Sequence, residues 1–250
     1  MVAVENGVIL LTAKNIPELW NNDFTKHVNS FDELKGTKKI FEVSDVSFAC
    51  QKTDSFVFFN VENKRKEISV DFENYRNVHV FACSSKYHVF AEVEFKDQII
   101  YCMWHEDKLV NGWDDVIKEE ITNFIVNKHA GKYTRDIIRC KTYAAFSPSA
   151  DKLLIGDPGL YVKVFDMKNL QIICSFTKNL VYGKFFFLDC RFMINVNLQV
   201  IDLKYFKSIL LRPRDKMSLA TFYFCRKRKL FFIFSFAVPI YCAKIILPRE

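Results

Sequence analysis

The residue types that could carry out catalysis or bind a metal ion are sparse in this chain. His105-Glu106-Asp107 is a polar triplet that directly follows a predicted strand. Adjacent residues of a turn point in divergent directions, whereas a metal site needs three or four convergent ligands, so we predict a solvated turn. The sequence contains no GxxxxGK, GxSxG or HExxH motif. We therefore predict a protein that is not an enzyme, with no metal site and no cofactor.

A basic run, Lys204–Lys229, is the strongest candidate for binding chemistry. It contains one acid, Asp215, and ends in a cationic block with aromatic residues interleaved before it; the block is Arg226, Lys227, Arg228 and Lys229. Such a patch holds the phosphates of nucleic acid or the head groups of anionic lipid. The alternative is a set of solvated turns, because charge alone selects no partner. The block also matches a nuclear localisation signal.

The composition predicts an all-β protein with a substantial core. Half of the 250 residues are hydrophobic, 26 are Phe, and only seven are Gly. The common apolar types are the strand-favouring Phe, Val, Ile and Tyr. These numbers argue against a disordered chain and against a mainly helical one.

The cysteines and the apolar segments bear on the compartment. The eight cysteines are scattered without a CxxC pair, which favours a reduced cytoplasmic or nuclear compartment. Met1–Lys14 lacks the basic start and cleavage pattern of a secretory signal. Leu230–Ala243 carries no charge, but it is shorter than the roughly 20 apolar residues of a spanning helix. We predict Phe-rich strands there and no membrane anchor.

The stretch Thr142–Phe176 consists of short apolar runs separated by polar turns. The runs are Tyr143–Phe146, Lys152–Ile155, Tyr161–Phe165 and Gln171–Phe176. The first two gaps contain Pro or Gly, which set turn dihedrals that other residues adopt less easily. Four strands of this length within about 40 residues predict one antiparallel blade of a propeller.

This stretch resembles a WD40 repeat. AFSPSADKLLIG is similar to the first two strands of that family, and Asp157 stands where the family often has a turn aspartate. Val162–Asp166 resembles the third strand, with Phe165-Asp166 in place of Trp-Asp. The resemblance implies a β-propeller whose rims and loops bind other proteins.

The third strand of this blade recurs along the chain. The corresponding anchor residues are Trp20, Phe59, Trp104, Phe165, Ile201 and Tyr241. Their spacing predicts a single domain, 1–250, of about six (six or seven) four-stranded antiparallel blades. The expected units are 1–32, 38–70, 76–112, 139–178, 181–211 and 217–250. In the second unit, Val46–Cys50 and Ser55–Phe58 are expected to precede the anchor. The alternative is that the chain is part of a longer array.

The spacing also predicts an insertion over residues 113–138, with a helix near 113–130. The helix is amphipathic because apolar residues recur at helical spacing among acidic ones; they include Trp113, Ile117, Ile121 and Phe124. Its apolar face either packs on the propeller rim or a channel mouth, or docks another protein.

The repeat register, together with the missing catalytic motifs, predicts a scaffold for protein–protein interaction. The alternative function is binding of nucleic acid or anionic lipid through residues 204–229. The resemblance also implies a context, since degenerate WD40 arrays occur at the C-terminal end of NACHT-type signalling ATPases. Ile16–Asn21 is similar to blades in such proteins.

Overall fold

The computed structural model describes residues 1–96, 98–110, 143–157, 161–177, 184–195, 199–205, 207–210, 221–225, 230–235 and 238–244. Within these residues the chain is almost entirely β, and its strands form six antiparallel sheets, numbered here in chain order. One short 3-10 helix, η1 (Asp32–Leu34), lies between the first two sheets in the sequence.

Sheets 1 to 3 are meanders in which each strand pairs with the next one along the chain. Sheet 1 contains β1 (Val2–Val4), β2 (Gly7–Leu11), β3 (Pro17–Trp20) and β4 (His27–Ser30). Sheet 2 contains β5 (Lys39–Glu42), β6 (Ser47–Gln51), β7 (Ser55–Asn60) and β8 (Arg65–Asp71). Sheet 3 contains β9 (Arg76–Cys83), β10 (His88–Phe95), β11 (Gln98–His105) and β12 (Lys108–Leu109).

Sheets 4 to 6 follow the same meander. Sheet 4 contains β13 (Tyr143–Phe146), β14 (Lys152–Asp157), β15 (Tyr161–Asp166) and β16 (Ile172–Thr177). Sheet 5 contains β17 (Phe185–Phe187), β18 (Phe192–Asn195), β19 (Gln199–Asp202) and β20 (Lys207–Leu210). The described strands of sheet 6 are β21 (Thr221–Cys225), β22 (Leu230–Ser235) and β23 (Val238–Lys244).

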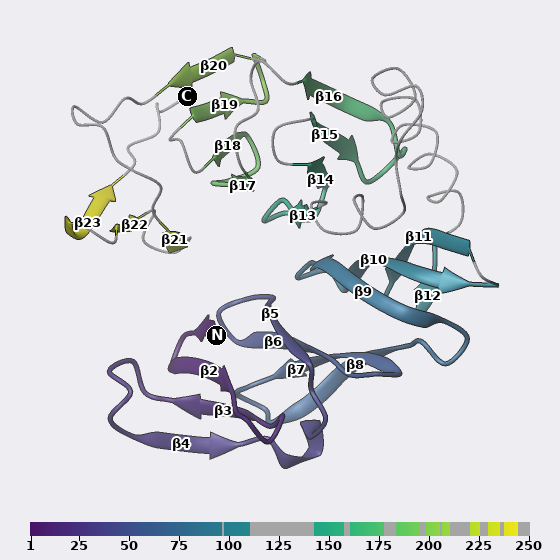
Figure 1. Cartoon of the computed structure of the whole chain (residues 1–250), viewed down its shortest axis with the longest axis vertical. Helices are drawn as coiled ribbons and strands as arrows, with labels where there is room; N and C mark the ends of the chain where they lie inside the picture. The colour runs from purple at the N-terminus through teal and green to yellow at the C-terminus, as the bar shows by residue number, and fades with distance from the viewer. Residues whose placement is uncertain are drawn as a thin grey trace.

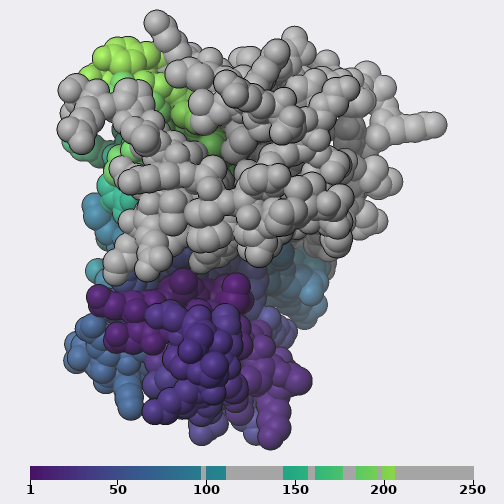
Figure 2. All heavy atoms as spheres, turned by 90° about the vertical axis from the view of Figure 1, so that its left-hand side faces the viewer, coloured from purple at the N-terminus to yellow at the C-terminus, as the bar shows by residue number. Residues whose placement is uncertain are grey.

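The sheets are arranged around a ring, with their first strands toward the centre (Figure 1). Strand β1 contacts β5, β5 contacts β9, β9 contacts β13, and β13 contacts β17. The first strands of successive sheets therefore adjoin one another, as in a β-propeller. In the space-filling view, the N-terminal sheets form one closely packed end of the molecule (Figure 2).

Apolar side chains fill the spaces between neighbouring sheets. Each of four core clusters combines residues of two successive sheets, from the pair of sheets 1 and 2 to the pair of sheets 4 and 5. Phe59 and Phe165 are each only 1% exposed in these clusters. Both faces of an interior sheet are thus buried, which explains why the strands are rich in Phe, Val and Ile.

The anchor residues lie on the third strand of every described sheet. Trp20 is on β3, Phe59 on β7, Trp104 on β11, Phe165 on β15, Ile201 on β19 and Tyr241 on β23. The prediction of an all-β fold of mostly four-stranded antiparallel sheets is confirmed. The helix near 113–130 lies outside the described residues, and the number of blades in the closed ring stays a prediction.

The expected strand order of sheet 2 is wrong. Its first strand is Lys39–Glu42, so Ser47–Gln51 is the second strand, and Ser55–Phe58 belongs to the anchor strand β7 itself. Lys39–Glu42 begins and ends with an exposed charged residue and is half-buried between them. Its two apolar residues are too few to produce the alternation that marks a strand in sequence.

The uncharged C-terminal segment is β structure. Strands β22 and β23 pair antiparallel, with Leu230 opposite Lys244 and Ser235 opposite Val238. The preference for strands over a spanning helix is therefore confirmed for the described part of this segment. Among the described residues, no helix has the length and apolar character needed to cross a membrane.

Tyr143 links sheet 4 to sheet 5. Its hydroxyl accepts a hydrogen bond from the Phe185 N–H at 3.0 Å. A Cβ on Gly156 would lie 2.7 Å from the Tyr143 ring, so the glycine leaves the space that the ring needs. The inner ends of the two sheets are therefore joined by a side chain and not by a strand ladder.

We expect Tyr143→Phe to lower the free energy of unfolding by about 1–3 kcal/mol, because the buried N–H of Phe185 would lose its acceptor. The urea midpoint of the wild type and of the variant measures this loss. Tyr205→Phe, which alters an exposed tyrosine of sheet 5, is the control. Equal midpoints for the two variants would contradict the role given to the Tyr143 hydroxyl.

Candidate partner-binding face

A cavity of about 150 Å³ opens where the first strands of sheets 2, 3 and 4 end. Its lining residues are Phe41–Val43, Phe81–Ser85 and Ala144–Pro148. We call it the mouth cavity. Because it is built from the ends of β5, β9 and β13, it lies on the face of the ring that carries the turns between first and second strands.

Three phenylalanine rings in the lining of the mouth cavity are held by other aromatic side chains. Phe41 meets Phe56 edge-on at 5.2 Å between ring centroids. The Phe81 centroid lies 5.8 Å from that of Phe90. Phe146 stacks on His88 at 5.7 Å across the boundary between sheets 4 and 3. Each of the three rings thus packs against another aromatic side chain, and together they form the apolar part of the cavity wall.

Ser84 and His88 form a pair that superficially matches a nucleophile and its base. The Ser84 Oγ lies 3.0 Å from the His88 Nδ1. The same oxygen also accepts the backbone N–H groups of Lys86 and His88, each at 3.2 Å. The hydroxyl is therefore engaged in closing the turn between β9 and β10, a local role that serine commonly has.

The ring of His88 packs against other rings and lies near a lysine. Its ring stacks on that of His105 at 4.4 Å with an interplanar angle of 15°. Desolvation, the adjacent His105 and Lys86 together lower the pKa of His88 to about 4. The imidazole is consequently neutral at pH 7, and its neutral form is the one that this packing stabilises.

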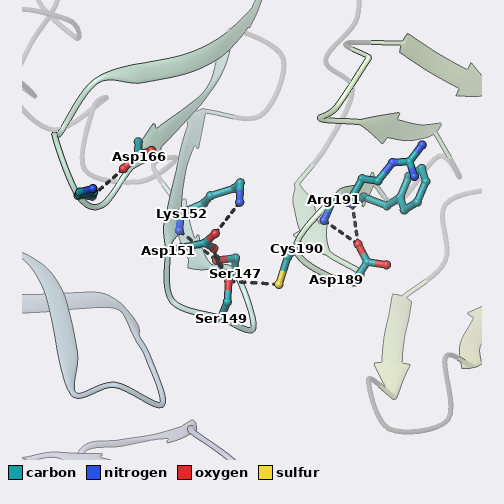
Figure 3. Close-up of polar contacts among 10 residues, drawn as sticks. Ser147, Ser149, Asp151, Lys152, Asp166, Asp189, Cys190 and Arg191 are labelled. Carbon is teal, nitrogen blue, oxygen red and sulfur yellow. Dashed lines mark hydrogen bonds and ion pairs between the residues drawn. The ribbon is translucent and has the colours of Figure 1, made fainter. Parts of the chain in front are cut away.

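The turn after β13 is organised by a carboxylate (Figure 3). Ser147 Oγ donates to Asp151 Oδ1 at 2.7 Å, Ser149 Oγ donates to the same oxygen, and Lys152 Nζ lies 2.7 Å from Oδ2. Burial opposes ionisation of Asp151, but the hydrogen bonds from Lys152, Ser149 and Ser147 outweigh it and hold the pKa at about 2. The carboxylate stays charged and the turn stays closed.

The corresponding turn of sheet 5 touches this one. Cys190 Sγ donates to Ser149 Oγ at 3.1 Å, as Figure 3 shows. Asp189 Oδ1 accepts the N–H groups of Arg191 at 2.8 Å and Phe192 at 2.7 Å. Two neighbouring sheets thus present pre-formed turns on the face of the mouth cavity.

Arg191 connects that turn to the exposed start of the basic run. Its guanidinium binds Asp202 through Nε at 3.0 Å and Nη2 at 2.7 Å. It also lies 5.1 Å from the ring centroid of Tyr205, which is 55% exposed. The Lys204 Nζ lies 5.3 Å from the same ring centroid. The side-chain bond from Arg191 lowers the pKa of Asp202, so the ion pair persists.

The residues proposed from sequence as partner-binding lie outside the described part of the chain. These are Trp113, Ile117, Ile121, Phe124, Arg226, Lys227, Arg228 and Lys229. Of the triplet His105-Glu106-Asp107, His105 ends β11, and Glu106-Asp107 are the exposed turn to β12, with Glu106 at a positive φ of 59°. Within the described residues, no group of His, Cys, Asp and Glu side chains is placed to hold a metal ion.

Sequence reasoning did not find the mouth cavity. Its walls come from Phe41, Phe81 and Phe146, which lie in different sheets. Each of these residues looks like an ordinary core phenylalanine in its own run. The feature that could have indicated the cavity is the predicted propeller ring, because a propeller brings the ends of successive first strands together.

The fold and its turns define the class of the protein. No family model matches the chain, and no curated protein matches it. Among solved structures, the chain is similar to the crystal structure of the β-propeller domain of Cps50 (Swd1) from Myceliophteria thermophila. The TM-score is 0.57 at 10% sequence identity, over 97% of this chain and 81% of that one. The chain thus has a β-propeller fold, which agrees with the fold that the WD40 resemblance of Thr142–Phe176 implies.

Proposed function

We propose that this protein is a non-catalytic scaffold that binds another protein by taking one apolar side chain into the mouth cavity. The WD40 propeller fold supports a role in protein–protein interaction in general. The observation that carries the finer proposal is the cavity itself, which three sheets line with aromatic rings and small side chains.

The size and lining of the mouth cavity suit a single side chain. At about 150 Å³, its volume equals that of a cavity that accepts a benzene-sized group. Aromatic or branched aliphatic residues that fill such pockets contribute a large share of the binding energy of an interface. A leucine or phenylalanine of a partner segment would bury its side chain against Phe41, Phe81 and Phe146.

The rim of the cavity suits a partner backbone. Glu42 and Ser85 are exposed there. Interfaces commonly surround an apolar centre with polar groups of this kind, which hydrogen-bond to the partner or to water. The pre-formed turns of sheets 4 and 5 continue the same face, so little conformational entropy is lost when a partner binds.

Ser85→Trp tests this proposal. The new side chain should cover the cavity from its exposed rim without altering the core. We expect protein partners recovered from a nuclease-treated lysate to fall by about tenfold or more, as for loss of an interface hot spot. Quantitative mass spectrometry of the retained proteins, at low and at moderate salt, measures the loss.

Lys108→Trp is the matched control, because Lys108 is exposed on the outer strand of the same sheet. It adds the same apolar surface away from the cavity. Equal recovery by Ser85→Trp and wild type would contradict a role for the mouth cavity. Retention of only nucleic acid or anionic lipid, lost as salt rises, would instead favour the second candidate function.

That second candidate is polyanion binding through residues 204–229. It is supported by the exposed Lys204 and Tyr205, which lie together with Arg191 at the start of the run. The cationic block Arg226–Lys229, which is outside the described residues, belongs to the same basic run of the sequence. A cytoplasmic or nuclear location, and a context within a NACHT-type protein, stay predictions.

A further inference from the structure

A second cavity, of about 500 Å³, lies between sheets 2 and 3 near the starts of β5 and β9. We call it the strand-start cavity. The mouth cavity adjoins the ends of the same two strands, so the two cavities belong to opposite faces of the ring. The side chains around the strand-start cavity include Lys38, Gln51, Lys52, Asn77 and His79.

Two backbone carbonyl groups on the inner edge of β9 already accept hydrogen bonds from side chains of sheet 2. Gln51 Nε2 donates to the Val78 carbonyl at 2.9 Å, and Lys39 Nζ donates to the Val80 carbonyl at 3.1 Å. In a β-strand the N–H and C=O of one residue point to the same edge. Val80 is fully buried, so the donor that this edge offers to a ligand in the cavity is the N–H of Val78.

The charged groups facing the cavity are mainly cationic. Lys38 is exposed, and Lys52 donates to the Glu33 carbonyl at 3.1 Å, a neutral acceptor. Glu92 is the one carboxylate in the described lining, but it is 6% exposed and engaged in an interaction of its own. The described lining thus contains no exposed carboxylate that could pair with Lys38 or Lys52.

Burial lowers the pKa of two basic groups near the strand-start cavity. Desolvation, and to a smaller extent the charge of Lys184, lowers the pKa of Lys39. Desolvation and the charge of Lys39 lower the pKa of His79. Burial is the main cause of both shifts, and an anion bound nearby would shift both pKa values back upward.

We infer that the strand-start cavity binds an acidic segment of a partner protein, with the lysines Lys38 and Lys52 paired to its carboxylates and the N–H of Val78 on β9 donating a hydrogen bond. This site lies on the face opposite the mouth cavity and does not depend on the proposed function. A partner that engaged both cavities would have to pass through or around the ring, so the two sites serve different segments or different partners.

The test is fluorescence anisotropy with a labelled octaglutamate peptide, with octaglutamine as the neutral counterpart. The wild type should bind octaglutamate and not octaglutamine, and binding should weaken as salt rises from about 50 to about 200 mM. The double variant Lys38→Gln/Lys52→Gln should weaken binding by about tenfold, as expected for two partly exposed ion pairs.

Lys66→Gln/Lys108→Gln is the matched control, because it removes the same charge from exposed outer strands of sheets 2 and 3. It should leave the affinity for octaglutamate unchanged. An equal loss in both double variants, or no loss in Lys38→Gln/Lys52→Gln, would overturn the inference. So would a failure of the wild type to bind octaglutamate.

A labelled octathymidylate measures the competing ligand class. Tighter binding of octathymidylate than of octaglutamate, lost in Lys38→Gln/Lys52→Gln, would overturn the choice of a protein segment. Ser85→Trp should bind octaglutamate like the wild type, since it alters the other face. Failure of the mouth-cavity proposal and failure of this one are therefore separate results.

Discussion

Phe165→Ala should lower the free energy of unfolding by about 3–5 kcal/mol, as a large truncation in a closed core does. Phe165 is 1% exposed and belongs to the core cluster between sheets 3 and 4, together with Met103 and Leu153. The space that it leaves is enclosed by strands of two sheets that are each fixed by their own ladders. The surrounding side chains can therefore relax only partly into it.

Thermal unfolding followed by circular dichroism measures this effect. For a domain of this size, the loss corresponds to a fall of roughly 6–20 °C in Tm. Phe186→Ala is the control, because Phe186 is 38% exposed on β17 of the next sheet. A fall no larger than that of Phe186→Ala would mean that Phe165 does not anchor the boundary between the sheets.

Acidification should destabilise the protein through His88. The pKa of His88 is lowered from 6.5 to about 4 in the folded chain. Between these pH values the imidazole is protonated in the unfolded state but not in the folded state. The contribution of His88 to the free energy of unfolding is therefore complete above about pH 6.5 and falls as the pH drops toward 4. The full shift corresponds to about 3 kcal/mol, which we reduce to about 2 kcal/mol because the ring is partly open to solvent.

The groups that face His88 set the direction of this effect. Ser84 lies at its Nδ1, His105 stacks on one side, and Phe146 packs against it from sheet 4. Lys86, in the same turn, adds a positive charge that also disfavours protonation.

His88→Asn should flatten the dependence of the urea midpoint on pH between about 6.5 and 4. His27→Asn, on the exposed outer strand β4, is the control that keeps the slope of the wild type. If the wild type shows no slope in this window, or if His88→Asn keeps it, the neutral packing of His88 does not limit stability in acid.

The local features of the sheets are readable in the sequence. The runs at Tyr143–Phe146, Lys152–Ile155, Tyr161–Phe165 and Gln171–Phe176 match β13 to β16 to within a few residues. Strand periodicity and turn chemistry act over a few residues, so they survive in the order of the amino acids. The sequence does not predict the strand Lys39–Glu42, because the neighbouring sheets of the ring cover it and its own residue pattern does not mark it.

The order of the amino acids predicts an all-β protein of repeated antiparallel sheets, with an aromatic or branched aliphatic anchor on each third strand. The two cavities to which we assign binding are visible only once the sheets are packed together. The mouth cavity is lined by Phe41, Phe81 and Phe146 from three sheets, and the strand-start cavity is lined by residues of sheets 2 and 3, among which Gln51 donates to the Val78 carbonyl. These contacts join residues about 30 to 105 positions apart, and they arise from ring geometry, which no local pattern encodes.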